Sequence, residues 1–378
     1  MTQKTAWLGA TVVLLASLIA AGCGSSGPKP AELVDFKATL RVAKVWHVQV
    51  GASGPYVLAP AFVDDSVVAA SASGDLWKIR ADNGKVVWRV RTGARFSGGV
   101  GVGENLVLAG TAKGVVLAFD LEGKPLWNAK VSSKVVGVPL PAGDVVVVRT
   151  GDNRVVALDA RDGSRRWLYQ ANQPPLTLRA SPAMTRADKL IVAGMPAGRV
   201  IALDLANGGL VWEAAVGIPK GDNEIERITD IAGRPTVEDG QICAVAFQGR
   251  VACYETQKGS QVWARAASSA TSLGSDAKSL YLSEAEGAVQ ALDKKVGTSL
   301  WRQDRLAYRE LSAPVVHGGH VVVGDLSGYL HYLRIEDGGF AARVDTDGSA
   351  IAAAPLDLVS RLLVQTRNGG LYAFEIKR

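Results

Sequence analysis

Beyond residue 40 the chain consists mainly of short apolar runs that are separated by clusters of Gly, Asn and Asp. Residues 98–102, 106–109, 115–119 and 126–130 form one group of four such runs. Runs of about four to eight residues rich in Val, Ile and Leu, bounded by turn-forming residues, are typical of β-strands. The pattern therefore predicts an all-β chain in which groups of four short strands follow one another.

These groups repeat about every 43 residues, which is the signature of a repeat architecture. In six groups a Gly ends the turn after the third strand, and a Trp follows that Gly four residues later. The Trp residues placed in this way are Trp88, Trp127, Trp167, Trp212, Trp263 and Trp301. Because an indole buries roughly 150–250 Å², we expect these side chains to pack between neighbouring groups.

Two further groups complete the pattern at the ends of the chain. The seventh has Ala342 in place of Trp, and Phe340 on the same strand face is the candidate to fill the space. The eighth reaches the C-terminus without a fourth strand, whereas residues 45–51, which include Trp46, copy residues 87–93. The sequence thus predicts an eight-bladed β-propeller with four antiparallel strands per blade, closed by the N-terminal strand.

The first residues have the pattern of an export signal. Lys4 precedes the uncharged, mostly apolar residues 6–21, and small residues lead directly to Cys23. This order is similar to that of bacterial lipoproteins, which implies cleavage after residue 22 and a lipid on Cys23. An ordinary secretory signal with an incidental Cys is the alternative. We expect a signal peptide over 1–22, a lipidated Cys and flexible tether over 23–37, and the propeller over 38–378.

Composition and charge exclude several other classes of protein. The 378 residues carry a net charge of +6 without a basic run, so nucleic acid is not an expected partner. His317 and His320 are the one possible metal-binding pair, but they flank an apparent turn and are expected to be solvated. No metal site is therefore predicted, and no arrangement of Ser, His and Asp indicates catalysis.

Cys243 and Cys253 lie five residues on either side of Gln248. A three-residue connection would place them opposite each other in a hairpin, where a disulfide is conceivable in an oxidising compartment. A two-residue turn would separate them. Because cross-strand disulfides between directly paired residues are often strained, the sequence slightly favours free buried thiols.

The repeated Gly, Asp, Gly and Trp positions resemble the repeat of pyrroloquinoline-quinone (PQQ) enzymes. With the lipoprotein-like start and eight groups, the chain is similar over its whole mature length to the BamB family of outer membrane protein assembly factors. Three local segments carry this closer resemblance: 176–179, 224–230 and 323–331. The resemblance implies a non-catalytic scaffold, lipid-anchored at the periplasmic face of the outer membrane, in the β-barrel assembly (BAM) complex. It implies no cofactor.

Loop lengths indicate a binding face. The spacing from each repeat Trp to the Pro of the next first strand is 12–14 residues after Trp46, Trp127 and Trp301, but 15 after Trp167 and 23 after Trp212. Both long loops should emerge on one face of adjacent blades, and loops beyond the usual length often carry function.

The resemblance implies that these loops bind the periplasmic domains of BamA. The candidate residues are Leu176, Leu178, Arg179 and Asp230, whereas Ala232 stands where a further acidic residue is expected. The alternative is that Leu176 and Leu178 are core residues and that Arg179 is merely solvated.

Two other functions remain open from the sequence: a periplasmic PQQ-dependent oxidoreductase, and a lipoprotein propeller that serves another envelope complex. The absence of adjacent cysteines argues against the quinone enzyme. The outer strands could also receive unfolded outer-membrane proteins by strand addition.

Overall fold

The computed structural model describes residues 27–172, 174–178 and 183–377, and the regular structure in these ranges is all β-strand. The strands form eight four-stranded antiparallel sheets, which are the blades of a propeller. Blade one comprises β2 (Ala61–Val63), β3 (Ser66–Ala70), β4 (Asp75–Arg80) and β5 (Val86–Arg91); blade two comprises β6 (Phe96–Gly103), β7 (Leu106–Thr111), β8 (Val115–Phe119) and β9 (Pro125–Lys130). Blade three comprises β10 (Leu140–Ala142), β11 (Val145–Arg149), β12 (Arg154–Asp159) and β13 (Arg165–Gln170); blade four comprises β14 (Met184–Ala187), β15 (Leu190–Met195), β16 (Arg199–Asp204) and β17 (Leu210–Ala215).

The second half of the ring continues the same order. Blade five comprises β18 (Thr236–Glu238), β19 (Gln241–Val245), β20 (Gly249–Glu255) and β21 (Gln261–Ala267); blade six comprises β22 (Gly274–Ser275), β23 (Ser279–Ser283), β24 (Val289–Asp293) and β25 (Ser299–Gln303). Blade seven comprises β26 (Val315–His317), β27 (His320–Gly324), β28 (Tyr329–Arg334) and β29 (Phe340–Asp345); blade eight comprises β30 (Leu356–Asp357), β31 (Leu362–Gln365), β32 (Gly370–Lys377) and β1 (Arg41–Gln49).

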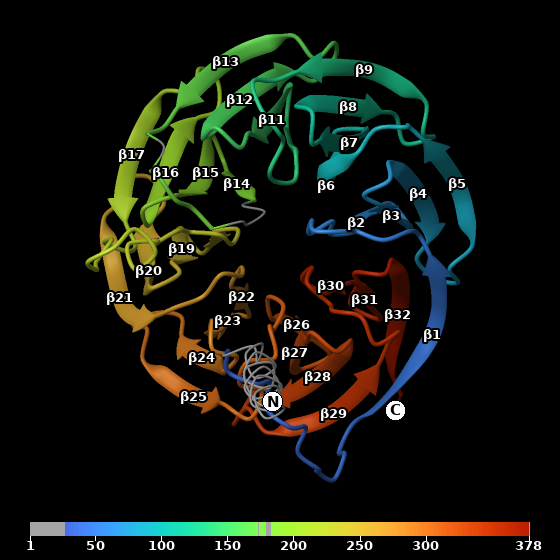
Figure 1. Cartoon of the computed structure of the whole chain (residues 1–378), viewed down its shortest axis with the longest axis vertical. Coiled ribbons are helices and arrows are strands. Elements are labelled where there is room, and N and C mark those ends of the chain that lie inside the picture. Colours follow the sequence, from blue (N-terminus) through green and yellow to red (C-terminus); the bar gives the residue numbers. More distant parts are fainter. Residues whose placement is uncertain (1–26, 173, 179–182, 378) are drawn as a thin grey trace, which may run out of the picture. The chain divides into compact units, whose positions relative to one another are not determined.

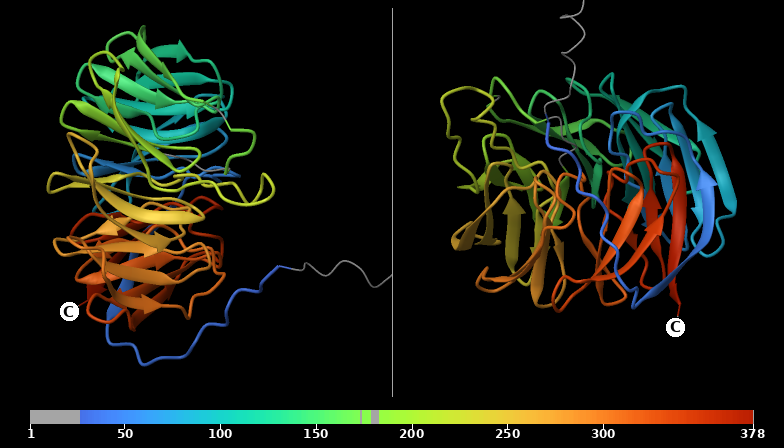
Figure 2. Two further views of the ribbon diagram at one scale, coloured as in Figure 1. Left: turned by 90° about the vertical axis from the view of Figure 1, so that its left-hand side faces the viewer. Right: turned by 60° about the horizontal axis from the view of Figure 1, so that its bottom comes forward.

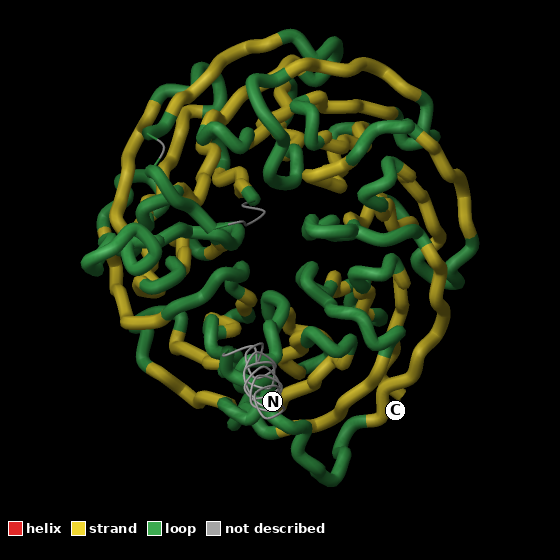
Figure 3. Tube along the Cα trace, in the orientation of Figure 1, coloured by secondary structure: helices red, strands yellow, loops and turns green. Residues whose placement is uncertain are grey.

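The blades stand in chain order around a central axis, with the first strand of each blade innermost and the fourth outermost (Figure 1). Turns and loops join them, as the tube in Figure 3 shows. Blade eight combines both ends of the chain, because β1 pairs antiparallel with β32 and places Trp46 opposite Ala373. This confirms the predicted eight-bladed ring closed by the N-terminal strand.

In the described part of the chain, no helix is long and apolar enough to cross a membrane.

The repeated Trp residues join each blade to the next. In all seven, Trp46 included, the indole Nε1 donates a hydrogen bond of 2.6–3.1 Å to a main-chain carbonyl of the following blade. The indole ring lies against the turn Gly of that blade: a Cβ built on Gly163 would stand 2.6 Å from Cε3 of Trp127. Buried aliphatic residues of adjacent blades pack below each Trp, so the core is a ring of inter-blade layers.

Blade seven departs from this pattern, and residues 31–40 compensate for it. Ala342 occupies the Trp position and is buried, as is Phe340. Phe36 stacks on Phe340 with ring centroids 5.2 Å apart, and Leu40 packs against the cluster that contains Ala342. The expectation that Phe340 fills the space at Ala342 is wrong, because the bulge in β29 pairs Phe340 with Leu333 and places it in the cluster between blades six and seven, beside Trp301. Ala342 lies in the cluster between blades seven and eight, where Leu40 of the segment before β1 packs.

Main-chain hydrogen bonds fix the same segment. The Ala31 N–H donates to Ala307 O at 2.8 Å, and the Thr39 N–H donates to Ala341 O at 2.9 Å. Two arginines hold it from the propeller side, since Arg309 Nη1 donates to Ala31 O at 2.9 Å and Arg343 Nη2 donates to Val34 O at 3.1 Å. The expected flexible tether over 23–37 is thus wrong from Ala31 onward, because aromatic packing and these carbonyl contacts attach residues 31–37 to the propeller.

Two expectations about single side chains are also wrong. Cys243 and Cys253 are directly paired on β19 and β20 and form a disulfide, with Cα atoms 4.1 Å apart. The Ala246 N–H donates to Arg250 O, so the connection is the three-residue one that brings the sulfurs together. His317 is buried rather than solvated, and its Nδ1 lies 2.7 Å from Asp357 Oδ1 on the neighbouring blade.

Candidate functional site

The two long loops emerge on the same face of adjacent blades. One joins β13 to β14 and is described at residues 171–172, 174–178 and 183, and the other joins β17 to β18 over residues 216–235. Each leads from an outermost strand to the innermost strand of the next blade, and the yellow-green loops project from one face of the disc in Figure 2. We call these segments the docking loops. Their lengths follow the spacings that the sequence predicts.

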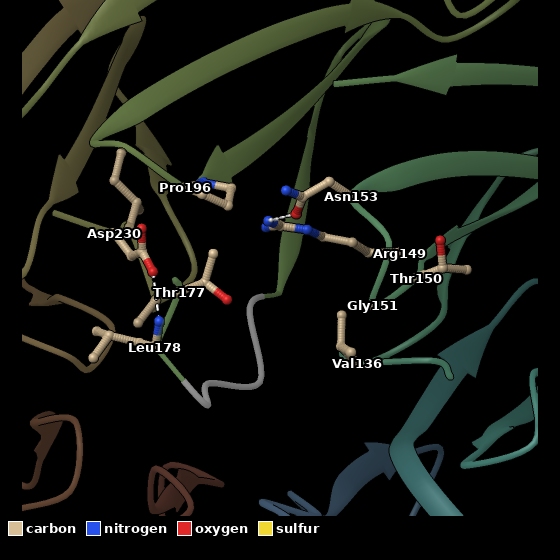
Figure 4. Close-up of a pocket in the computed structure, with 11 residues that line it drawn as sticks. Val136, Arg149, Thr150, Gly151, Asn153, Thr177, Leu178, Pro196 and Asp230 are labelled. Carbon is tan, nitrogen blue, oxygen red and sulfur yellow. Dashed lines mark hydrogen bonds between the residues drawn. The ribbon is translucent and has the colours of Figure 1, made fainter. Parts of the chain in front are cut away.

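Asp230 fixes the two docking loops to each other. Its Oδ2 accepts a hydrogen bond of 2.6 Å from the Leu178 N–H (Figure 4). Its Oδ1 accepts one of 3.0 Å from the Ala197 N–H. The Asp230 side chain is buried, with 5% of the residue exposed. Asp230 therefore acts on this face by positioning the loop around Leu178, and its carboxylate is largely hidden from a partner.

Three aliphatic side chains on the docking loops face solvent. Leu176 is 46% exposed, Ile218 61% and Ile225 69%. Leu178 is half-buried, and Arg179 lies outside the described residues. Because Leu176 is exposed, the alternative in which it belongs to the core is wrong. Aliphatic side chains held in the open on one face are the usual centre of a protein interface.

The outermost part of the second loop has an ordered local structure of its own. Asn223 Oδ1 accepts hydrogen bonds of 3.0 Å from the N–H groups of Ile225 and Glu226. Glu226 Oε2 accepts one of 2.7 Å from the Asp222 N–H. These bonds close a compact turn that holds Ile225 outward, which reduces the entropy lost when a partner covers it.

A small pocket lies beneath the first docking loop. It measures about 70 Å³, and its walls include Arg149, Asn153, Thr177, Leu178 and Asp230 (Figure 4). Burial lowers the pKa of the Arg149 guanidinium to about 10, although the nearby charge of Asp230 acts in the opposite direction. The Arg149 side chain therefore remains a cation at neutral pH, in the wall of the pocket.

The structure brings Leu178 and Asp230 into contact, and Leu176 lies two residues before Leu178 on the same loop. Ile218, Ile225 and Arg149 were not among the residues predicted from the sequence. Ile218 and Ile225 could have been predicted, because the loop after Trp212 is unusually long and contains few apolar residues. Arg149 gave no such signal, because it lies within a strand of the ordinary repeat. Among the described residues, no group of three or more His, Cys, Asp and Glu side chains is arranged to hold a metal.

Comparisons with known proteins agree with this geometry. A family model described as outer membrane protein assembly factor BamB matches residues 42–122, 72–303 and 285–378. The protein of that name from Burkholderia pseudomallei is 40% identical over 363 residues, which are 95% of each chain. The crystal structure of BamB from Moraxella catarrhalis matches with a TM-score of 0.82 and 27% identity, over 89% of this chain and 100% of that one. The quinohemoprotein alcohol dehydrogenase from Comamonas testosteroni, with a TM-score of 0.71 and 14% identity over 88% of this chain and 76% of its own, shares the fold alone.

Proposed function

The chain belongs to the BamB family of outer membrane protein assembly factors, and on this premise we propose that its docking loops bind the periplasmic domains of BamA in the BAM complex. The relatives' names describe assembly factors rather than enzymes. The protein is therefore a non-catalytic scaffold that supports the assembly and insertion of β-barrel proteins into the outer membrane. The PQQ-dependent oxidoreductase and the scaffold of another envelope complex are set aside.

The exposed side chain of Leu176 on a loop held by Asp230 is the observation that carries this proposal. A partner that covers Leu176, Ile218 and Ile225 removes three aliphatic side chains from water at about 1.5–3 kcal/mol each when burial is complete. The Asp230 hydrogen bonds hold the Leu178 main chain before binding, so less ordering is required when the partner docks. Arg179, next along the chain, completes the proposed contact set with a positive charge.

The test is titration calorimetry with the purified periplasmic domains of BamA. We expect Leu176→Ser to weaken binding by about tenfold or more, because the variant loses the burial of an aliphatic side chain. Leu300→Ser is the matched control, since Leu300 is 53% exposed on the outer strand β25, away from the docking loops. Replacing Leu178 and Arg179 together should abolish copurification with BamA at an unchanged melting temperature. Equal affinity of wild type and both Leu variants would exclude the docking loops as the interface.

The anchor is the second element of the proposal. Cys23 carries the lipid, residues 1–22 are the signal peptide, and the tether ends before the attached segment that starts at Ala31. The lipid places the protein at the periplasmic face of the outer membrane. Metabolic labelling with a fatty acid should mark the wild type and leave Cys23→Ser unmarked and in the soluble periplasmic fraction. Labelling of Cys23→Ser would refute the assignment.

The outer strands provide a place for clients, the unfolded outer-membrane proteins. The residue before the repeat Trp is exposed and aliphatic in most blades: Val45, Val87, Leu126, Val211, Val262 and Leu300 are 38–53% exposed. Each outer strand has one edge that no strand of its own sheet occupies. An extended client segment can pair with such an edge and cover the neighbouring aliphatic side chain. Photocrosslinkers at Val211 should capture nascent barrel proteins, whereas a crosslinker at Asp82 in an exposed turn should not; equal capture at both would count against this role.

A further inference from the structure

Arg149 interrupts the repeat at one fixed position. Arg149 stands at or next to the end of the second strand, at a position that pairs with an aliphatic residue of the third strand in every blade, as Arg149 does with Val155. The corresponding residues elsewhere are small or uncharged: Ala70, Gly110, Gly194, Val245, Ser283, Gly324 and Gln365. The propeller fold therefore does not require an arginine here, and the buried charge of Arg149 calls for another explanation.

The hydrogen-bonding capacity of Arg149 is only partly used. The residue is 4% exposed; Nη1 donates to Gly194 O, and Nη2 lies 3.5 Å from Asn153 Oδ1, the limit of a hydrogen bond. Nε is buried and, within the described part of the chain, has no acceptor. An arginine buried to this degree is normally paired with an anion, because an uncompensated charge away from water is costly.

This chain does not place such an anion in contact with Arg149. Among the described residues no carboxylate lies within ion-pair distance of Arg149, and residues 1–26, 173, 179–182 and 378 include no Asp or Glu. The charge of Asp230, which lines the same pocket, favours the Arg149 cation, but its oxygens are held by the N–H groups of Leu178 and Ala197, and no hydrogen bond within the described residues joins Asp230 to Arg149. The missing partner of Arg149 is thus an acceptor that enters from outside.

The pocket suits a carboxylate. The unpartnered Nε and the weakly engaged Nη2 lie on the same edge of the guanidinium, the edge that binds a carboxylate through two parallel hydrogen bonds. The volume of about 70 Å³ is enough for the end of an Asp or Glu side chain. The pocket is bordered by Thr177 and Leu178 of the first docking loop, so a partner seated there can reach it.

We propose that an acidic side chain of the docked partner enters this pocket and forms an ion pair with Arg149. The proposal rests on the proposed binding of BamA's periplasmic domains and adds a buried specificity contact beneath the aliphatic surface. Truncating one member of a buried, hydrogen-bonded charge pair across an interface commonly weakens binding by thirtyfold or more. Arg149 is therefore the residue of this face that selects a partner with a carboxylate at the matching position.

The test uses the mature protein and the purified periplasmic domains of BamA in titration calorimetry. Arg149→Gln should weaken binding by about thirtyfold or more. Arg154→Gln should leave the affinity within about threefold. This substitution removes the same charge from the same blade, but the Arg154 side chain is 38% exposed and already pairs with Asp152. If the wild type does not bind at all, the proposed function fails. If the wild type binds and Arg149→Gln binds equally well, only the ion pair is overturned.

A double-mutant cycle separates the ion pair from a purely structural role of Arg149. Each Asp and Glu of the BamA domains is changed singly to Asn or Gln. The resulting change in affinity is measured for the wild-type protein and for the Arg149→Gln variant. We expect one neutralised acid to weaken the wild-type complex by about thirtyfold and the Arg149→Gln complex by less than threefold. If every acid has the same effect in both backgrounds, the proposal is refuted. If Arg149→Gln does not fold, Arg149→Lys, which keeps the charge without the two-pronged geometry, replaces it in the cycle.

Discussion

Gly208 packs directly against the indole ring of Trp167 across the boundary between blades three and four. A Cβ atom built on Gly208 would stand 2.5 Å from Cε3 of the Trp167 indole, closer than carbon atoms can approach. The indole Nε1 donates to Leu205 O at 2.9 Å in the same turn, and Gly208 has a φ of +73°, in the left-handed region. The indole and the glycine therefore fit only as a pair, and the fit recurs around the ring.

Both halves of this contact are expected to be essential for stability. Trp167→Ala should lower the free energy of unfolding by about 3–5 kcal/mol through the cavity it leaves. Gly208→Ala should lower it by about 2–4 kcal/mol through overpacking and backbone strain. Leu210→Ala, at a residue that is 46% exposed in the same blade, should stay within about 0.5 kcal/mol. Chemical denaturation measures all three, and a wild-type midpoint for Trp167→Ala would contradict the role of the indole.

The disulfide between Cys243 and Cys253 should stabilise blade five by a modest amount. It closes a short loop with a sequence separation of 10, for which the chain-entropy model gives about 2–3 kcal/mol. Adding a reductant should lower the denaturation midpoint of the wild type and leave that of a Cys243→Ala, Cys253→Ala double variant unchanged. A titration of thiols in the unfolded, unreduced protein should find neither of these two cysteines free; two reactive thiols would disprove the bond.

Removal of the Phe36 ring should loosen blade seven. Phe36 stacks on Phe340, and the Arg343 guanidinium lies 5.1 Å from the Phe36 ring centroid. Phe36→Ala should therefore raise amide hydrogen exchange in β29 and in residues 31–40 and leave the other blades unaffected. Lys37→Ala, at the exposed neighbouring position, is the control and should change neither region. Unchanged exchange in Phe36→Ala would mean that the segment does not support the blade.

Acid should weaken the attachment of the same segment. Burial lowers the pKa of His331 despite its hydrogen bond to Asp325, and Arg343 Nε donates to His331 Nδ1, so the neutral ring donates from Nε2 to Asp325. Burial alone would raise the pKa of Asp325, but the hydrogen bonds from His331, the Tyr329 N–H and Arg309 outweigh it, and the pKa is lowered. Both groups bind protons more readily in the unfolded chain.

The free energy of unfolding should therefore fall as pH drops below about 6.5, the ordinary pKa of His, and fall further below about 4, that of Asp. Denaturation curves between pH 8 and pH 3 measure this slope. His331→Gln should flatten its upper part, whereas His320→Gln should preserve it, because His320 Nδ1 contacts only Gly318 O of its own turn among the described residues. A wild-type stability that is constant from pH 7 to pH 5 would disagree with a buried neutral His331.

The repeat made most of the fold predictable. Gly and Trp at a constant spacing gave the blades, the copy of residues 87–93 around Trp46 gave the ring closure, and the Pro spacings gave the docking loops. These features are local, and each recurs several times, so they can be read from one sequence. The contact between Phe36 and Arg343 occurs once and joins segments about 300 residues apart. Because it is not part of the repeat, the periodicity of the sequence cannot predict it.

The candidate site was predictable only in part for the same reason. Leu176 and Leu178 stand out as aliphatic residues in a long loop, but the burial of Asp230 depends on where the Leu178 and Ala197 N–H groups lie. The disulfide depended on whether the hairpin turn has two or three residues, which the letters around Gln248 do not decide. Arg149 is conspicuous only when the strands of all blades are superimposed in register.

The attachment of residues 31–40 also determines how the propeller bears mechanical load. With a lipid on Cys23, tension from the bilayer reaches the protein through the N-terminus, and β1 is the strand that keeps the ring shut. The contacts of Ala31, Val34 and Phe36 lie upstream of β1 and transfer that tension to blade seven before it arrives. The attached segment thus carries the tension before it reaches the pairing of β1 with β32, and it protects the closure of the ring from forces exerted by the membrane.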